Sequence, residues 1–396
     1  MRHLELVEDA VQDALMSALT SWMEHEVPDD PSAWLYRVAW NGLIQDLRLS
    51  SRRQRLLDRA GEGLRDEGNQ VNAFSPDEVR SDMLRMLFVC CDEAIPWESR
   101  LVLALKTLCG FSTGEIALRL FTSEANVHKR LGRARDRLRR SPPDIEGLPL
   151  QALGARLPGV HSVIYLIFNE GYLSANAERA IRRELCEKAV ELATLLVGHP
   201  VGAVPESFAL LALLHLQMAR LGSRIDDTGG LLLLEEQDRS LWDRDRIRVG
   251  VEWLQRSADG EVFSRLHAEA GIAAEHCLAP TFHETRWDEI ARLYAMLERI
   301  APSPLHTVNR AVAVAEYEGP QAGLAVLNAL APPAWLSDSY HWNAVMSDLH
   351  LRIGNIEIAR RHRGLALESA PSRAVRDLLR RRLRSAAPPG EQTAPE

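Results

Sequence analysis

The chain has 396 residues with a formal net charge of −8 at pH 7, and 46% of its residues are hydrophobic and 26% charged. These values are typical of a globular protein large enough for two or three domains. The most apolar stretch, residues 207–221, is too short and too polar to span a bilayer, and we expect no signal peptide. The cysteines show neither a CxxC pair nor the spacing of a disulfide framework, so we expect a cytoplasmic, reducing environment for Cys90, Cys91, Cys109, Cys186 and Cys277.

Helical periodicity runs through almost the whole chain and long alternating strand patterns are absent, so the sequence predicts an all-α fold. Near the N-terminus, helical spacing forms an apolar stripe from Val7, Val11, Ala14, Leu15, Ala18 and Trp22. The stripe is flanked by the acidic residues Glu5, Glu8, Asp9 and Asp13. Such a flank suits a basic partner protein rather than DNA, and from the residues alone a solvated acidic face is an equally good interpretation.

A second predicted helix interleaves two kinds of side chain, the aromatic Trp34, Tyr36 and Trp40 and the polar Arg37, Asn41 and Arg48. Residues 37–59 hold six arginines and two acids. Unstacked single-stranded bases need aromatic rings for stacking and cations for the backbone, although some of these rings must also belong to the core. The following residues, 60–80, contain Gly, Asn, Pro and charges without apolar spacing, and we interpret them as a linker.

A helix-turn-helix is predicted in residues 112–140. Ser112 and Glu115 fit a capping box that opens a short helix, whose inner side carries Ile116, Ala117 and Leu120. After a tight turn, Thr122 or Ser123 can cap a second helix. The inner side of this second helix repeats at helical spacing, with Val127, Leu131, Ala134 and Leu138.

The outer side of the second helix is basic and carries Asn126, Arg130, Arg133 and Arg137. Between Arg119 and Arg140, eight Lys and Arg residues stand against two acids. Asn, Arg and Lys side chains read base edges through hydrogen bonds, and flanking arginines suit phosphates. A solvated, Arg-rich helix is the usual interpretation of a charge run, but the capped helix and turn before it favour DNA binding in the major groove.

These three segments, in this order, resemble the conserved regions of bacterial sigma-70-type factors of the extracytoplasmic-function class. "ELVEDAVQDALMSALTSW" is similar to the region that binds the clamp helices of the β′ subunit of RNA polymerase. "DPSAWLYRVAWNGLIQDLRLSSRRQR" is similar to the region that melts promoters and reads the −10 element. The motif of that region is matched, with one residue fewer between its last two positions, by Trp34, Leu35, Ala39, Asn41, Asp46 and Arg48. The helix-turn-helix is similar to the region that reads the −35 element.

The resemblance implies roles for individual residues. Polymerase binding falls to Glu5, Glu8, Asp9, Gln12 and Asp13. Contacts with −10 DNA fall to Trp34, Arg37, Asn41, Arg48, Arg52 and Arg53. Contacts with −35 DNA fall to Ser123, Glu124, Asn126, His128, Lys129, Arg130, Arg133 and Arg137. Members of the class carry a further helix ahead of the polymerase-binding segment, so the resemblance implies a first domain that is N-terminally short.

The remaining residues resemble the extension of a sigma-factor group with tetratricopeptide-like helices, including the motif "YLIFNEGYLS" at residues 165–174. Gly319 and Gly354 are 35 positions apart, close to the period of such helical pairs. Small residues and a closing proline follow at Ala359, Ala366 and Pro371. The expected organisation is a first domain, a linker, a helix-turn-helix domain, a tetratricopeptide-like extension and a disordered tail, at residues 1–59, 60–80, 81–140, 141–385 and 386–396.

We expect the extension to regulate the factor in place of a separate anti-sigma protein. The segment "SPPDIEGLPL", from Ser141, is short and its paired prolines end the basic helix, so the extension should pack on the −35-reading domain. Apolar surface should dominate this packing. The acids of residues 231–245, "LLLLEEQDRSLWDRD", are expected to contact basic residues of that domain, each pair contributing at most about 1 kcal/mol.

No motif for catalysis or metal binding competes with this interpretation. In "FNEGY", Asn169, Glu170 and Tyr172 could form a polar site, but a helix end with a turn at Gly171 and the rings in the core is the better interpretation. The histidines and cysteine near Glu284 match no metal spacing, namely His276, Cys277 and His283. We therefore expect no cofactor, no metal and no enzymatic activity.

The residues are compatible with three functions. The first is an alternative sigma factor that brings RNA polymerase to promoter DNA. The second is a stand-alone helix-turn-helix regulator with a helical-repeat sensor, and the third is an enzyme tethered to DNA. The second has no use for a clamp-binding or single-strand-reading segment, so the sigma factor is the leading hypothesis.

Overall fold

The computed structural model describes residues 2–24, 27–28, 31, 34–43, 76–120, 122–140, 150–173, 181–226 and 230–383. Over these residues the protein is all-α, as predicted, and an isolated bridge between Ile225 and Leu231 is its only extended pairing. The predicted site residues Arg48, Arg52 and Arg53 lie outside the described residues, as do most of the two predicted linkers and the tail.

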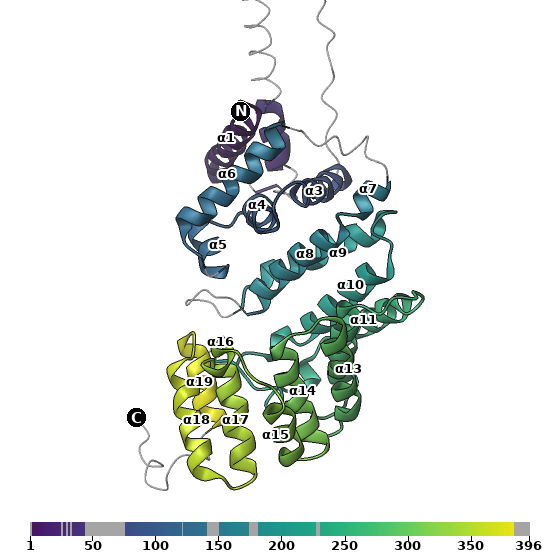
Figure 1. Ribbon diagram of the computed structural model, residues 1–396. Helices are drawn as coiled ribbons and strands as arrows, with labels where there is room; N and C mark the ends of the chain where they lie inside the picture. The colour runs from purple at the N-terminus through teal and green to yellow at the C-terminus, as the bar shows by residue number, and fades with distance from the viewer. Residues whose placement is uncertain are drawn as a thin grey trace, which may run out of the picture.

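The first helices carry the N-terminal segment and the helix-turn-helix. They are α1 (Arg2–Glu24), a helical stretch at 34–43, α3 (Pro76–Cys90), α4 (Trp97–Cys109), α5 (Thr113–Arg119) and α6 (Glu124–Arg140). The α3 helix begins at Pro76, inside the segment predicted as a linker. Figure 1 shows α3 to α6 in the upper part of the molecule, directly above α8 and α9.

The extension contains the remaining helices and two short 3-10 turns, η1 (Leu221–Ser223) and η2 (Arg239–Leu241). Its helices are α7 (Leu150–Gly154), α8 (Leu157–Tyr172), α9 (Arg183–Gly198), α10 (Pro205–Ala219), α11 (Arg244–Ser257), α12 (Arg265–Leu278), α13 (Trp287–Ile300), α14 (Pro304–Tyr317), α15 (Pro320–Asn328), α16 (Ala334–Ser337), α17 (Tyr340–Arg352), α18 (Ile356–Glu368) and α19 (Arg373–Arg382). Neighbouring helices pack as antiparallel pairs, and α16 to α19 form the far end of the molecule (Figure 1).

The helix-turn-helix and the start of the extension share one hydrophobic core. Leu87, Phe111 and Ile116 from the first part and Ile164 and Leu192 from the second are all fully buried in the same cluster. α8 packs against α4, and α9 packs against α3. Burial of apolar surface is the dominant favourable term in folding, so these two parts stabilise each other.

The α10 helix is the centre of the extension. It contains the most apolar stretch of the sequence. Helices α8, α9, α11 and α12 all pack against it. A helix with apolar side chains on all of its faces is buried by its neighbours on all of those faces. Among the described helices, none combines the length and the hydropathy that a membrane span requires.

The predicted stripe of α1 is divided between two environments. Ala10, Ala14 and Ala18 are buried. Val11 and Leu15 are instead 45% and 48% exposed, so one part of the predicted stripe is covered and the other part faces solvent. The small alanines let α1 lie close to its neighbours, and the larger side chains stand on the adjacent, uncovered face.

Gly171 does not form the turn that the sequence suggested. It lies in the last helical turn of α8, which continues to Tyr172. A Cβ at Gly171 would lie 2.7 Å from the Arg182 carbonyl oxygen and 2.7 Å from the Cys186 nitrogen and sulfur. The prediction was therefore wrong, because glycine is needed here for the close approach of α9 rather than for backbone freedom.

Among the described residues, no hydrogen bond or ion pair joins the acids of residues 231–245 to the helix-turn-helix, so that prediction was also wrong. The Glu236 carboxylate lies 3.6 Å from the guanidinium of Arg381 in α19. Asp238 and Asp243 accept hydrogen bonds from backbone N–H groups and cap η2 and α11. The segment is held at the far end of the molecule, since Leu231 is buried with the apolar residues of α18 and α19.

Two helical pairs of the extension turn at glycines in matching places. Gly319 lies between α14 and α15 and has φ +101°, and Gly354 lies between α17 and α18 and has φ +85°. Such backbone angles favour glycine because a side chain there is strained. Ala359 and Ala366 are fully buried and allow α18 to approach α17 closely.

Candidate nucleic-acid interface

The helix-turn-helix is built by two side-chain caps. In the first, the Ser112 backbone N–H donates to Glu115 Oε2 at 2.8 Å and the Glu115 N–H donates to Ser112 Oγ at 3.2 Å. In the second, the Asn126 N–H donates to Ser123 Oγ at 3.3 Å. Both the predicted capping box of α5 and the predicted cap of α6 are confirmed.

The inner side of α6 is confirmed as well. Val127, Leu131 and Ala134 are buried, and Leu138 packs against the same core. On α5, Ile116 and Ala117 are buried and Leu120 packs beside them. Because the inner residues are fixed, the opposite face of α6 is turned to solvent.

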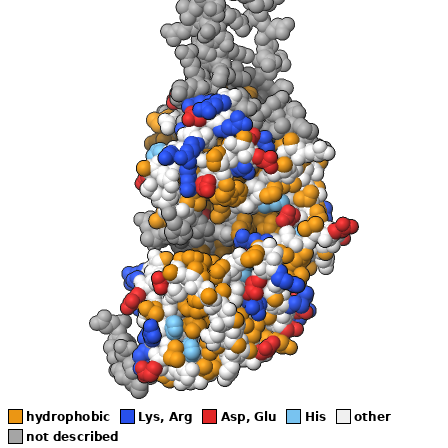
Figure 2. All heavy atoms as spheres, in the orientation of Figure 1, with side chains coloured by type: hydrophobic (Ala, Val, Ile, Leu, Met, Phe, Trp, Pro, Cys, Tyr) orange, Lys and Arg blue, Asp and Glu red, His pale blue; other side chains and the backbone are white. Residues whose placement is uncertain are grey.

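The outer face of α6 is basic and accessible. Its predicted DNA-contacting residues are exposed at Ser123, Glu124, His128, Lys129 and Arg133 and half-buried at Asn126, Arg130 and Arg137. Figure 2 shows Lys and Arg side chains gathered over α6. Within the described part of the chain, Lys129, Arg130 and Arg133 have no carboxylate partner, in contrast to the Arg139–Asp136 pair. These cations are therefore available to an anionic ligand.

Two of the predicted DNA-contacting residues also hold the motif together. Glu124 accepts a hydrogen bond from Thr113 Oγ1 at 3.1 Å, which joins the N-terminal ends of α5 and α6. Asn126 Nδ2 donates to Thr122 Oγ1 at 2.7 Å. The contact between Thr113 and Glu124 could not be predicted from the sequence, because neither side-chain spacing nor charge indicates a bond between two helices.

The described residues that were predicted to contact −10 DNA differ in their exposure to solvent. Arg37, Trp40 and Asn41 are exposed, and their spacing places them on one face of the helical stretch at 34–43. Trp34 is half-buried, and its ring centroid lies 5.4 Å from that of Trp22 in α1. Trp34 thus contributes to packing against α1, and the exposed trio forms the accessible surface.

Helix α1 presents acidic and apolar side chains together. Asp9, Gln12 and Asp13 are exposed, whereas the side chains of Glu5 and Glu8 lie outside the described residues. Large apolar side chains are also exposed, at Val11 and Leu15 of the predicted stripe and at Met16, Leu19 and Met23 beside it. The spacing of Met16, Leu19 and Met23 could have been recognised as a widening of the stripe. An exposed apolar face with an acidic border is typical of a protein-binding surface rather than a DNA-binding one.

Charged residues of the extension reach the helix-turn-helix domain. Arg156 donates to the Phe88 carbonyl oxygen at 2.9 Å and pairs with Asp92 at 2.7 Å. Arg182 Nη1 lies 3.3 Å from Glu115 Oε1, on the capping box of α5. The backbone N–H of Ser112 chiefly, with Arg182, holds the pKa of Glu115 below its ordinary value. The charges are arranged in the opposite way to the prediction, because the extension supplies the cations and the helix-turn-helix domain supplies the acids.

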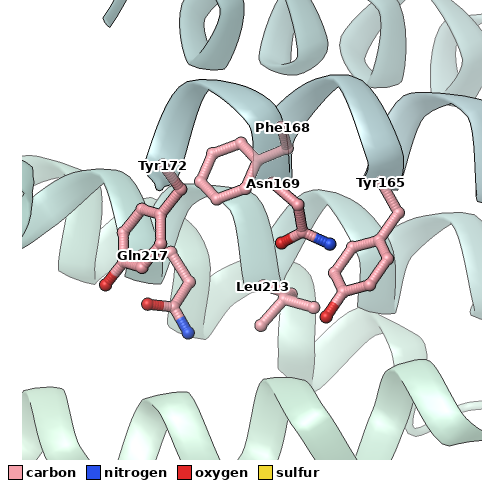
Figure 3. Close-up of a pocket in the computed structure, with 6 residues that line it drawn as sticks. All are labelled: Tyr165, Phe168, Asn169, Tyr172, Leu213 and Gln217. Atoms are coloured by element: carbon pink, nitrogen blue, oxygen red, sulfur yellow. The ribbon is translucent and has the colours of Figure 1, made fainter. Parts of the chain in front are cut away.

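The polar residues of "FNEGY" do not converge on one site. Asn169 and Tyr172 line a small pocket with Tyr165 and Phe168 of α8 and with Leu213 and Gln217 of α10 (Figure 3). Glu170 is buried outside this lining. Over the described ranges, no group of three or more His, Cys, Asp or Glu side chains could hold a metal ion.

Family comparisons agree with the order of these elements. Residues 1–53 match sigma-70 region 2, residues 85–138 match sigma-70 region 4, and residues 156–258 match a family of unknown function, DUF6596. An uncharacterised protein of Rhizobium meliloti (strain 1021), R00370, is 36% identical over 385 residues, which cover 94% of this chain and 89% of that protein. No solved structure matches the chain significantly.

A relative of named function matches the N-terminal part. The ECF RNA polymerase sigma factor SigL of Mycobacterium tuberculosis (strain H37Rv) is 33% identical over 151 residues, which cover 37% of this chain and 76% of SigL. The chain therefore belongs to the ECF family of RNA polymerase sigma factors, which are promoter-recognition proteins without enzymatic activity.

Proposed function

We propose that this sigma factor reads the −35 element of its promoters through the outer face of α6. The observation that carries the proposal is the set of cations Lys129, Arg130 and Arg133, which have no carboxylate partner among the described residues and lie on a helix whose start is capped by Ser123. A rigid helix with free Arg and Lys side chains suits both base edges and phosphates in the major groove.

Arg130→Ala tests this proposal in holoenzyme reconstituted with core polymerase. If Arg130 reads a base, binding to promoter DNA weakens by about 1–3 kcal/mol, and the loss disappears on probes with a substituted −35 element. If it touches phosphate, the loss persists on every probe and the salt dependence becomes shallower. Arg299→Ala, at an exposed position of α13, is the matched control. An unchanged promoter profile for the triple alanine variant of Asn126, Lys129 and Arg130 contradicts the proposal.

We propose further that the exposed trio Arg37, Trp40 and Asn41 contacts the unstacked −10 strand. Stacking on an aromatic ring contributes about 1–3 kcal/mol per base, so Trp40→Ala should reduce promoter opening. Permanganate reactivity of thymines in the −10 element measures this opening. Normal opening by Trp40→Ala, at equal occupancy of the promoter, argues against the assignment.

We propose that α1 binds the clamp helices of the polymerase β′ subunit through its acidic and apolar faces. Reversal of charge at Asp9 and Asp13 to Arg should weaken capture of core polymerase, because complementary charge steers such encounters. The same reversal at Asp245, an exposed acid of α11, is the control. Equal capture by the two variants would refute the clamp assignment.

We propose that the extension is a regulatory scaffold built on region 4, in which α14–α15 and α17–α18 are tetratricopeptide-like units. The shared core supports close attachment, and the exposed outer face of α6 leaves DNA binding compatible with it. Transcription by reconstituted holoenzyme should therefore change when the residues after Pro143 are removed. Equal transcription from matched, folded proteins would contradict the proposal.

A finer test isolates the charged contact between the two parts. Arg182→Ala removes the pair with Glu115, whereas Arg183→Ala removes a neighbouring arginine that pairs with Glu187 of the same helix at 3.7 Å. Arg182→Ala should alter −35-dependent transcription, and Arg183→Ala should not. Glu115→Gln keeps an acceptor for the Ser112 N–H and should reproduce the Arg182→Ala effect. Identical behaviour of the two arginine variants would exclude a specific role for Arg182.

A further inference from the structure

The pocket between α8 and α10 has a defined shape and composition. Tyr165, Phe168, Asn169 and Tyr172 line one side at helical spacing, and Leu213 and Gln217, four residues apart on α10, line the other. Its volume is about 70 Å³. Pockets for drug-sized ligands measure about 300–1,000 Å³, so this one has room for a single ring or a smaller group.

The lining has no formal charge. Two arginines lie over lining rings and are already held, since Arg265 pairs with Glu269 at 2.6 Å and Arg224 donates to the Tyr172 carbonyl oxygen. The Arg224 guanidinium lies 3.7 Å from the centroid of the Tyr172 ring. A charged ligand would lose its water without gaining a counter-charge from the lining residues, which is costly. An uncharged ligand fits this environment.

Hydrogen-bonding groups remain open on one side of the pocket. The Tyr165 hydroxyl is hydrogen-bonded to the Glu269 carboxylate and the Asn169 carboxamide. With the described residues, the Gln217 carboxamide and the Tyr172 hydroxyl form no hydrogen bond. Figure 3 shows the Gln217 amide beside the Tyr172 ring, with both polar ends at the same end of the pocket.

We propose that this pocket binds a small uncharged planar molecule, an aromatic ring that carries a carboxamide or an equivalent donor–acceptor edge. Its ring would lie among Tyr165, Phe168 and Tyr172, whose faces suit stacked or edge-on aromatic contacts. Its polar edge would pair with the Gln217 carboxamide, which supplies one donor group and one acceptor. The proposal concerns a ligand site of the extension and does not depend on how the chain reads promoters.

Benzamide is the probe for this proposal, and benzoate is its charged control of nearly equal shape. Ligand-observed NMR titration of the full chain should give binding of benzamide that is about tenfold tighter than that of benzoate. Gln217→Leu, which keeps the side-chain size but removes the carboxamide, should weaken benzamide binding about tenfold. Tyr172→Phe should weaken it by a smaller factor.

Gln321→Leu, at an exposed position of α15, is the matched control and should leave benzamide binding unchanged. Unfolding curves that coincide with wild type show that each variant is folded. The proposal is overturned if benzamide does not bind up to its solubility limit, if benzoate binds equally well, or if Gln217→Leu binds benzamide as tightly as wild type.

Discussion

At the scale of single residues, two histidines that the sequence leaves unassigned are packed against other side chains, His161 fully buried and His276 half-buried. His161 Nε2 lies 2.8 Å from Ser207 Oγ, and burial lowers the pKa of His161 to about 4, with a smaller opposing effect from Glu206. The His276 ring meets the Trp287 ring at 5.3 Å, and burial with nearby arginines lowers the pKa of His276 to about 3. Both histidines are therefore neutral in the folded protein at pH 7.

Stability should fall as the pH is lowered from about 6.5, the pKa of histidine in an unfolded chain, toward about 4. Over this window the unfolded chain binds protons that His161 and His276 do not bind in the folded protein, so protonation favours unfolding. Urea unfolding at pH 7.5 and pH 5.5 measures the loss. His161→Gln, which can still bond to Ser207, should show a smaller loss, and an equal loss would contradict the role of His161.

At the scale of elements, glycines decide how closely the helices approach and where they turn. Gly171 lets α9 meet the end of α8, and Gly319 and Gly354 supply left-handed turns between paired helices. Gly198 and Gly364 are helical glycines with open space around their Cα atoms. These three kinds of environment predict different effects for the same change from glycine to alanine.

Gly171→Ala should destabilise the protein by about 1–3 kcal/mol, because its methyl group would overlap the backbone of α9. Gly198→Ala, at the end of α9, has no such neighbour and should be neutral or slightly stabilising. The free energies of unfolding in urea compare the two. Equal effects would show that α9 can move away from α8 without cost.

Gly354→Ala should cost roughly 1–2 kcal/mol, the strain of a side chain in the left-handed region. Gly354→Asn should cost less, since asparagine tolerates these angles. Gly364→Ala, within α18 of the same helical pair, should instead stabilise by about 0.5–1 kcal/mol. Urea unfolding measures all three, and a stabilising Gly354→Ala would mean that the turn has other conformations available.

At the scale of the whole molecule, region 4 and the start of the extension behave as one unit because they share a core. Arg156 stands at the centre of this junction, is 8% exposed, and bonds to Phe88 and Asp92. Its removal leaves buried acceptors without a donor. Loss of such a bond costs about 1–3 kcal/mol.

Arg156→Ala should therefore loosen both sides of the junction together. Hydrogen exchange should become faster in α4 and in α8 to a similar extent, since opening of either helix exposes the same core. Arg183→Ala, an exposed variant of α9, should leave both rates unchanged. Faster exchange confined to one of the two helices would show that the two parts open independently.

Local spacing was enough to predict the all-α fold and the DNA-binding element. The capping box of Ser112 and Glu115, the cap at Ser123 and the inner face of α6 all depend on residues a few positions apart. These features depend on short-range interactions, so they could be predicted without knowledge of the packing.

Only the tertiary structure decided which faces meet. Helical period identified an apolar stripe on α1 but could not show that the alanines are covered and Leu15 is not. The same limit applies to Gly171 at the close approach of α9, to Glu236 with Arg381, and to Arg182 with Glu115. Periodicity determines which residues share a face, whereas the partner of that face is set by packing among helices that are distant in the chain.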